Sequence, residues 1–294
     1  MQQHISLALK GALMGAANVI PGVSGGTMAL LTGIFEPLIN SIKSFNFTAV
    51  KLITSGKFKE FSEHVNLTFL IPVGCGIILS ILSVARLLEY LFDHHAVLVW
   101  AFFFGLILAS VYFIGKRIKN ITSSIIGLFI LGTAMATTIA FIEPATENAS
   151  FPYLLLCGVI AMCSMILPGL SGSYILLPMR NYQLIMIEAI NGLRIDILLP
   201  VAIGAAGGLF IFARVLSWIF KRFHDQTIAL LTGFIFGSLA ILWPWKTAVL
   251  KVFELDGVVK EKVIGYSYNL PEFTASTLVT AGVMIIGVLS PLLQ

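Results

Sequence analysis

Charged residues are scarce in this chain of 294 residues. Asp, Glu, Lys and Arg make up 11% of the sequence and hydrophobic residues 58%, whereas soluble domains carry about 25% charged residues. The mean hydropathy is +0.98. Because such a surplus of apolar side chains needs lipid as its solvent, the composition excludes a soluble globular protein and predicts a multi-pass membrane protein.

Residues that mark enzymes and cofactor sites are also missing. The three cysteines, Cys75, Cys157 and Cys163, lie in apolar segments without CxxC spacing, and we interpret them as core residues. The sequence has no Ser-His-Asp order, no His/Cys metal constellation, no P-loop and no dinucleotide fingerprint. The net charge of +4 comes from loop residues and not from a basic stripe. We therefore expect no enzyme, no cofactor and no nucleic-acid partner.

Eight uncharged runs mark the expected membrane elements. They are 11–35, 66–85, 96–115, 120–142, 148–179, 197–213, 226–245 and 273–294. Six of them can be extended to the roughly 20 residues that a helix needs to cross about 30 Å of hydrocarbon. Two of these extensions take in Arg86 and Arg214. The first run has no A-x-A site, so a cleaved signal peptide is not expected.

Two colinear blocks of matches indicate an internal duplication. The stretch Ile-Pro-Gly-Val-Ser-Gly at 20–25 returns as Leu-Pro-Gly-Leu-Ser-Gly at 167–172, which defines an offset of 147 in the numbering. A second register, with an offset of 128, contains these pairs: Pro72 with Pro200, Gly76 with Gly204, Arg86 with Arg214, and Gly105 with Gly233. Segments 120–142 and 273–294 show no comparable match. The sequence thus predicts one repeat at 1–147 and a second at 148–294.

Pro and Gly in the middle of segments 11–35 and 148–179 break the expected helices. Each remaining piece reaches about halfway across the membrane. Non-helical backbone at this depth is tolerated where protein buries it or where it lines a wet cavity, so we expect re-entrant hairpins. Each half then makes three crossings, an odd number, and the second half is inverted relative to the first.

The predicted fold is therefore an all-α polytopic membrane protein with two inverted-topology repeats. Each repeat consists of a re-entrant broken-helix hairpin and three transmembrane helices. The first has its hairpin at about 5–41 and helices at about 66–92, 96–115 and 120–142. The second has its hairpin at about 151–191 and helices at about 196–220, 226–245 and 273–293.

Loop charges leave a second topology open. The loop at 93–95 is acidic with two histidines and its counterpart at 221–222 is basic, as inversion requires. A raw count of loop Lys and Arg favours the alternative. With both broken segments spanning, 13 basic residues lie inside and 2 outside, whereas inversion gives 9 and 6.

The two Pro-Gly-x-Ser-Gly turns are the strongest candidates for a binding site. Glycines permit close backbone approach, and the helix after each turn should present free N–H groups and a positive dipole end. Together these features predict an anion site near the bilayer midplane, although a kink packed through small residues is the alternative. The candidate substrate-binding residues are Ser24, Gly25, Gly26 and Thr27 of the first turn and Ser171, Gly172 and Ser173 of the second.

Arginines and acids near the apolar segments complete the candidate site. Arg86 and Arg214 hold matching positions, and a guanidinium suits a phosphate; snorkelling is the alternative. Glu36 and Glu89 are candidate proton carriers, or ordinary helix-end residues. The sequence also leaves open whether Lys10 and Asn18, on the first hairpin helix, line the site or only pack.

The stretch 15–27, Gly-Ala-Ala-Asn-Val-Ile-Pro-Gly-Val-Ser-Gly-Gly-Thr, followed by Gly-Ile-Phe-Glu at 33–36, resembles the opening signature of the undecaprenyl phosphate translocases. The second turn, 167–173, resembles that family's second signature, and the similarity covers essentially the whole chain. The resemblance implies a multi-pass protein of the bacterial inner (plasma) membrane. It also implies a flippase that moves undecaprenyl phosphate, or a related polyprenyl phosphate, from the outer to the cytoplasmic leaflet for reuse in peptidoglycan and other cell-wall polymers.

Two alternatives stay open at this point. Undecaprenyl pyrophosphate phosphatases have a similar turn, but Gly25 and Gly172 stand where that family has Arg, whose loss makes hydrolysis improbable. A small-anion transporter or channel would be indifferent to a polyprenyl tail. For the flippase, we expect alternating access of the two halves with proton or cation coupling, because inward movement of an anion opposes the membrane potential.

Overall fold

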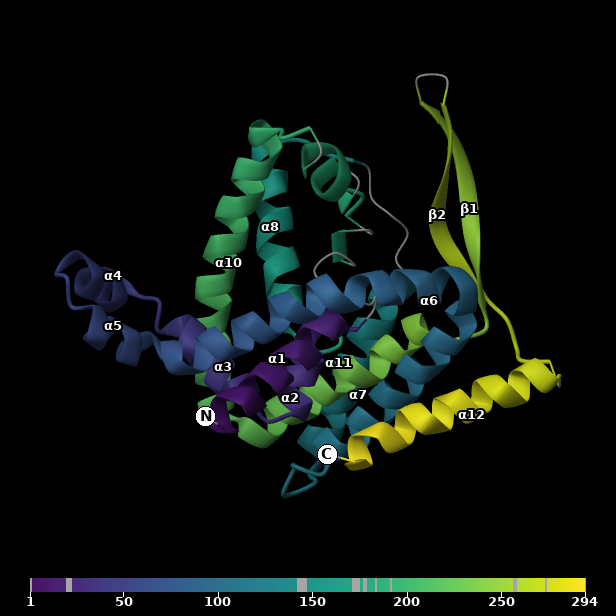
Figure 1. The fold of residues 1–294 in the computed structure, drawn as a ribbon, viewed down its shortest axis with the longest axis horizontal. Helices are drawn as coiled ribbons and strands as arrows, with labels where there is room; N and C mark the ends of the chain where they lie inside the picture. The colour runs from purple at the N-terminus through teal and green to yellow at the C-terminus, as the bar shows by residue number, and fades with distance from the viewer. Residues whose placement is uncertain are drawn as a thin grey trace. The chain divides into compact units, whose positions relative to one another are not determined.

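The computed structural model describes nearly the whole chain (Figure 1). It covers residues 2–19, 23–141, 147–170, 175–176, 179–182, 184–190, 192–255, 258–272 and 274–293. The first-half helices are α1 (Gln2–Val19), α2 (Gly25–Leu31), α3 (Phe35–Lys43), α4 (Phe47–Thr54), α5 (Phe58–Val65), α6 (Leu67–Gly115) and α7 (Ser123–Phe141). The second half has α8 (Phe151–Ile166), a π-helical turn (Leu184–Ala189), α10 (Ile195–Arg222), α11 (His224–Leu242), strands β1 (Lys246–Leu255) and β2 (Val258–Tyr268), α12 (Ala275–Leu289) and a 3-10 turn (Ser290–Leu293).

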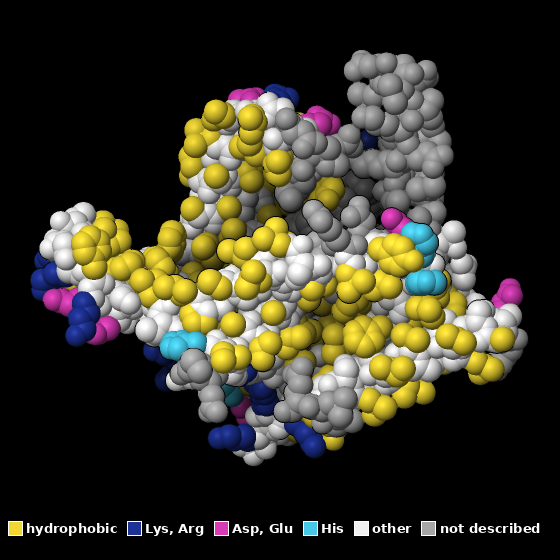
Figure 2. Space-filling view, viewed as in Figure 1, with side chains coloured by type: hydrophobic (Ala, Val, Ile, Leu, Met, Phe, Trp, Pro, Cys, Tyr) yellow, Lys and Arg dark blue, Asp and Glu magenta, His cyan; other side chains and the backbone are white. Residues whose placement is uncertain are grey.

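Among these residues, four helical stretches are long and apolar enough to cross a membrane: Leu67–Val84, Tyr90–Gly115, Ile195–Arg222 and His224–Leu242. Three shorter apolar helices, Ser123–Ile139, Phe151–Ile166 and Ala275–Leu289, accompany them. Helix α10 exposes Leu199, Ile203, Ile211 and Val215 on its surface, and Figure 2 shows hydrophobic side chains along it. Such a surface suits lipid, and the prediction of a helical multi-pass membrane protein is confirmed.

The chain forms two compact units, and each draws on both halves of the sequence. Unit 1 contains Met1–Glu89 and Ser110–Ser238, and unit 2 contains Tyr90–Ala109 and Leu239–Gln294. Helices α8 and α10 pack side by side in unit 1, as Figure 1 shows. Unit 2 holds the middle of α6, the two strands and α12.

Single-residue kinks replace the expected loops at 93–95 and 221–222. Helix α6 runs through 93–95 with one non-helical residue, His95, at φ −140° and ψ 37°. Helices α10 and α11 are separated by Phe223 alone, at φ −136° and ψ 57°. His95 and Phe223 are related by the second offset found in the sequence, and they share one backbone conformation.

Glycines at matched positions let helices touch through their backbones in unit 1. A Cβ on Gly76 of α6 would overlap the Ala8 carbonyl oxygen of α1, and a Cβ on Gly204 of α10 would overlap the Leu155 carbonyl oxygen of α8. The two glycines are related by the second sequence offset and the two carbonyls by the first. The packing of α1 on α6 is therefore repeated by the packing of α8 on α10.

The remaining long helices repeat a second contact, once in each unit. In unit 1, α7 and α11 meet at two contacts, Gly233 with the Phe129 carbonyl and Gly132 with the Leu230 carbonyl. In unit 2, α6 and α12 meet at Gly105 with the Met284 carbonyl and Gly287 with the Phe102 carbonyl. Gly132 of α7 is thus matched by Gly287 of α12. The two halves of the sequence show no such match in these segments, because the similarity of α7 and α12 consists of one glycine and the position of the backbone.

A β-hairpin occupies what the sequence analysis treated as a loop of mixed charge. Strands β1 and β2 pair antiparallel, with an irregularity between Val249 and Leu250. Valine-rich stretches on both sides of Asp256-Gly257, a typical two-residue hairpin sequence, could have predicted it.

Candidate functional site

Ser24 organises the start of α2, just after the first Pro-Gly stretch, whose residues 20–22 lie outside the described part of the chain. It is the N-cap of α2, with extended backbone at φ −113° and ψ 135°. Its Oγ accepts a hydrogen bond from the Gly26 N–H at 3.1 Å, and its carbonyl accepts one from the Thr27 N–H at 2.9 Å. Asn18 at the end of α1 accepts the Gly25 N–H at 2.8 Å. The N–H groups expected to await an anion are therefore occupied in this conformation.

The second turn packs directly on the first. The Gly169 N–H donates to Thr27 Oγ1 at 2.9 Å, and Ser24 Oγ donates to the Leu167 carbonyl at 3.3 Å. Ser24 is 1% exposed and Thr27 is fully buried. A Cβ on Gly26 would lie 2.7 Å from the Ile166 carbonyl oxygen, so this close approach requires glycine. The structure thus brings together two turns that lie in opposite halves of the sequence.

Cations cap the other end of α2. Lys10 Nζ donates to the Thr32 carbonyl at 2.9 Å, and Arg117 Nη2 donates to the Leu31 carbonyl at 2.8 Å. Positive charge is favourable at a helix C-terminus. Lys10 and Asn18 therefore hold α2 at its two ends, and this role accounts for both residues.

Hydrogen bonds join the two ends of the second hairpin, opposite its Pro-Gly turn. Asn181, which is fully buried, donates from Nδ2 to the Asn148 carbonyl at 2.8 Å and accepts the Asn148 N–H at 3.1 Å. The Tyr153 hydroxyl donates to the Met179 carbonyl at 3.1 Å. The chain therefore returns, after α8 and the turn, to the end where α8 began.

One of these contacts has a counterpart in the first hairpin, made by a different donor to the equivalent carbonyl. The Thr32 carbonyl that Lys10 binds and the Met179 carbonyl that Tyr153 binds are related by the same offset as the two turns. The next residue in each hairpin has positive φ, 76° at Gly33 and 54° at Arg180. Left-handed backbone is natural for glycine and uncommon for arginine, so the repeated geometry belongs to the fold and not to the residue type.

Several predicted site residues fall outside the described part of the chain. Ser171, Gly172 and Ser173 are among the residues left out, and the side chains of Arg86 and Glu89 on α6 are also outside it. Arg214 is described, and it is exposed on α10. Its Nη1 donates to the Phe210 carbonyl of its own helix at 3.4 Å, and no contact with the turns is seen among the described residues.

Glu36 belongs to a small polar cluster that the sequence analysis did not foresee. Its Oε1 lies 3.3 Å from His224 Nε2, and His224 Nδ1 lies 3.1 Å from Asp225 Oδ1. Asp225 Oδ2 in turn accepts the Lys119 N–H at 3.1 Å. Glu36 and His224 are about half exposed. The cluster joins the starts of α3 and α11 to the segment that follows α6, and no sequence spacing pointed to His224.

Helix α3 is fixed beside this cluster by contacts with α10. The Phe35 and Phe220 rings lie 5.7 Å apart between centroids. Ser217 Oγ donates to Asn40 Oδ1 at 2.9 Å. Within the described residues, no group of three His, Cys, Asp or Glu side chains could hold a metal ion.

Comparison with known proteins identifies the family. A family model described as undecaprenyl phosphate translocase-like matches residues 14–259. A polyprenyl-phosphate transporter of Vibrio cholerae serotype O1 is 38% identical over 94% of this chain and 88% of its own length. A polyprenyl-phosphate transporter of Staphylococcus aureus is 32% identical over 80% of this chain and 85% of its own length. No solved structure matches. The family and these relatives are named for transport and not for catalysis, and the chain belongs to the undecaprenyl phosphate translocase-like family.

Proposed function

We propose that this protein moves undecaprenyl phosphate from the outer to the cytoplasmic leaflet of the bacterial inner membrane, where the carrier is reused in cell-wall synthesis. The names of its relatives support polyprenyl phosphate as the substrate. The observation that carries the proposal is the direct contact between the two Pro-Gly turns, in which Thr27 Oγ1 and the Gly169 N–H join the two halves. One site built from both halves is what alternating access requires.

Contacts at one end of unit 1 support the inverted topology. The Lys119 N–H bonds to Asp225, so the segment after α6 and the start of α11 lie at the same end. If the second half is inverted, both segments are cytoplasmic. If both broken segments span the membrane instead, the two lie on opposite sides. In the inverted topology, five basic residues therefore gather on the cytoplasmic side, in accord with the positive-inside rule. They are Lys116, Arg117, Lys119, Lys221 and Arg222.

Re-entrant hairpins are supported by their closed ends. The Asn148 and Asn181 pair joins residues on either side of the second turn, and Lys10 with Thr32 does so for the first. A spanning segment would separate its two ends by the thickness of the membrane, about 30 Å.

The present conformation is the closed form of the proposed site. Ser24 and Thr27 are buried and bonded to the opposite turn, so a phosphate can enter only when these bonds are exchanged for bonds to its oxygens. Ser171, Gly172 and Ser173 would supply the second side. Arg86 or Arg214 would neutralise the phosphate during passage, and the polyprenyl tail would remain in lipid.

Inward transport of an anion needs an energy source. Moving one negative charge toward a negative interior costs about 2.3 kcal/mol per 100 mV. Glu36 is our candidate proton carrier, because His224 faces it across 3.3 Å and can exchange a proton with it. Glu89 is the second candidate.

Surface display of undecaprenyl phosphate on intact cells tests this function. A phosphate-lipid-directed probe is applied with and without the gene, in cells that lack other recycling transporters. We expect the lipid to accumulate on the outer surface when the gene is lost, and we expect Arg86→Ala/Arg214→Ala to fail to restore it. Accumulation of the pyrophosphate form would contradict the proposal, and so would no change in either lipid.

A further inference from the structure

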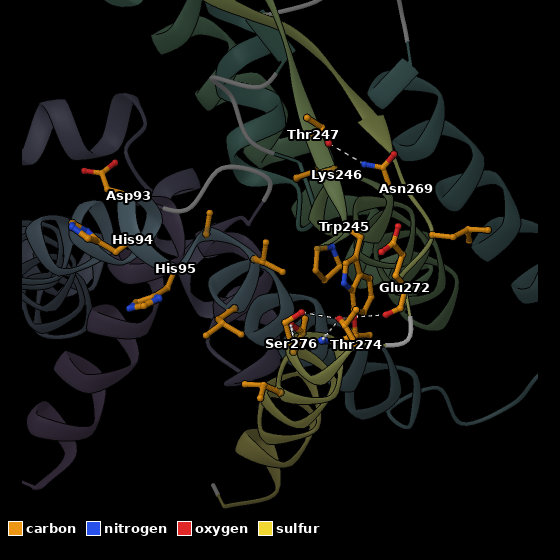
Figure 3. Close-up of a pocket in the computed structure, with 18 residues that line it drawn as sticks. Asp93, His94, His95, Trp245, Lys246, Thr247, Asn269, Glu272, Thr274 and Ser276 are labelled. Atoms are coloured by element: carbon orange, nitrogen blue, oxygen red, sulfur yellow. Dashed lines mark hydrogen bonds between the residues drawn. The ribbon is translucent and has the colours of Figure 1, made fainter.

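Unit 2 contains an open cavity of about 980 Å³ that none of the predicted site residues lines. Three parts of the chain form it, as Figure 3 shows: the kink of α6, the base of the β-hairpin and the start of α12. Its lining residues include Asp93, His94 and His95 from the kink, Trp245, Lys246 and Thr247 from the hairpin base, and Asn269, Glu272, Thr274 and Ser276 from the segment that leads into α12.

Lys246 is the one Lys or Arg among the described residues that line this cavity. Its ammonium lies 3.6 Å from the centre of the Trp100 ring and also donates to the Ile241 carbonyl. These contacts hold the ammonium against the Trp100 ring and the Ile241 carbonyl, next to the cavity that the Lys246 side chain lines. Burial lowers the pKa of Lys246 to about 7.

Neutral donors and imidazoles also line the cavity. Asn269 Nδ2 donates to Thr247 Oγ1 at 2.9 Å, so the amide and hydroxyl are held in place. Thr274 caps α12, and Thr274 and Ser276 present hydroxyls 2.8 Å apart. His94 Nδ1 lies 2.9 Å from the Tyr90 carbonyl oxygen, which can only accept a hydrogen bond, and the His94 ring stacks on Tyr90.

The rest of the lining suits a ligand that has both a charged and an apolar end. Ala96, Val97, Leu98 and Val279 form an apolar wall beside the polar groups. Asp93 and Glu272 also line the cavity, and their negative charge limits how tightly an anion is held.

We propose that this cavity binds a phosphate monoester and is the outer docking site for the headgroup of the polyprenyl phosphate. The position on the outer side rests on the proposed function. In the inverted topology, residues 93–95 and 246–272 both lie outside, whereas the spanning alternative places them on opposite sides. Their presence around one cavity agrees with the inverted topology.

Titration calorimetry on the purified full-length protein tests this site. The probes are geranyl phosphate, inorganic phosphate and geraniol, which lacks the phosphate. We expect geranyl phosphate to bind, inorganic phosphate to bind more weakly and geraniol to give no specific signal. Equal binding of the two phosphates would overturn the docking role and would identify free phosphate as the ligand.

Two variants separate the cavity from the rest of the molecule. Lys246→Met removes the cation, and we expect geranyl phosphate to bind about tenfold more weakly, because hydrogen bonds to charged groups are the stronger ones. Asn269→Asp adds a negative charge on an exposed residue without a change of shape, and should weaken binding in the same direction. Lys57→Met removes one exposed cation on the α4–α5 segment and is the matched control.

The outcomes distinguish this inference from the proposed function. Unchanged affinity in both Lys246→Met and Asn269→Asp would overturn the cavity site, even if the cells show flipping. Loss of affinity in both variants and not in Lys57→Met supports the cavity site, even if the surface-display experiment fails.

Discussion

The cluster of Pro-Gly turns and the cavity at the α6 kink are both polar, yet they differ in what their polar groups do. In the turns, Ser24 and Thr27 are buried and bonded to the opposite turn. In the cavity, Asn269 and Thr274 are exposed and face open space. In the proposed function the turns hold the two halves together until a phosphate separates them, whereas the proposed cavity site is already open in this conformation.

Replacing Gly26 should separate the two turns and should cause the largest loss of stability and transport. In Gly26→Ala the new Cβ meets the Ile166 carbonyl at 2.7 Å, so the turns must separate. We expect a loss of about 3 kcal/mol in stability, as for other overpacked sites, together with loss of transport. Thermal unfolding in detergent measures the first.

Gly74→Ala is the control for this change, because nothing lies within 4 Å of a Cβ there. An unfolding temperature for Gly26→Ala that equals that of Gly74→Ala would show that the turns do not touch as described.

Removal of one hydroxyl should cost more stability in the turns than in the cavity. Thr27→Val keeps the shape of the side chain but leaves the buried Gly169 N–H without its acceptor. We expect a loss of about 1 to 3 kcal/mol, the cost of an unsatisfied buried donor. The matching change in the cavity, Thr247→Val, should cost much less, since Thr247 is exposed. Equal losses in thermal unfolding would remove the distinction between the two regions.

The cavity should respond to pH through Lys246, whose pKa is about 7. Below this pH the ammonium is charged, so binding of geranyl phosphate should weaken as pH rises above 7 and level off near the tenfold loss expected for Lys246→Met, a dependence that Asp93, His94, His95 and Glu272 modify. The unfolded chain keeps this proton until about pH 10.4, so stability should rise with pH between 7 and 10.

Calorimetry across pH 6 to 9 measures this dependence. Lys246→Arg keeps its charge throughout and should flatten the profile. A wild-type pH profile that matches that of Lys246→Arg would show that the charge of Lys246 does not control binding.

Glu36→Gln should have the smallest effect on stability and a specific effect on transport. The Glu36 and His224 pair is about half exposed, so its loss should cost less than about 1 kcal/mol. If Glu36 carries the coupling proton, transport should slow and lose its pH dependence. Asp196→Asn, on an exposed residue paired only with Arg194 among its described contacts, is the control. Full transport with an unchanged pH profile in Glu36→Gln would remove the coupling role.

The sequence predicts the elements that depend on composition and on glycine. The apolar runs locate the helices, and the repeated Pro-Gly stretch pairs the turns that meet at Thr27 and Gly169. It could not predict that the N–H groups of Gly25 and Gly26 are occupied, because their acceptors depend on how α1 ends. The Glu36 and His224 pair joins residues from opposite halves of the chain, and only packing of α3 on α10 brings them together.

The kinks show a second feature that the sequence alone did not predict. The charged stretch 93–95 is typical of a loop, yet the helix continues through it with one distorted residue, His95. The break in helical backbone is thus confined to one residue of this charged stretch. The match of α7 with α12 is likewise visible only in three dimensions.

Lipid flipping by reconstituted protein tests directly whether transport depends on the contact between the two turns. The purified protein is placed in liposomes that contain undecaprenyl phosphate, and a membrane-impermeant phosphate-lipid probe follows the lipid in the outer leaflet over time. We expect wild type and Gly74→Ala to move the lipid and Gly26→Ala not to move it. Lipid movement by Gly26→Ala at the wild-type rate, or none by folded wild-type protein, would contradict this expectation.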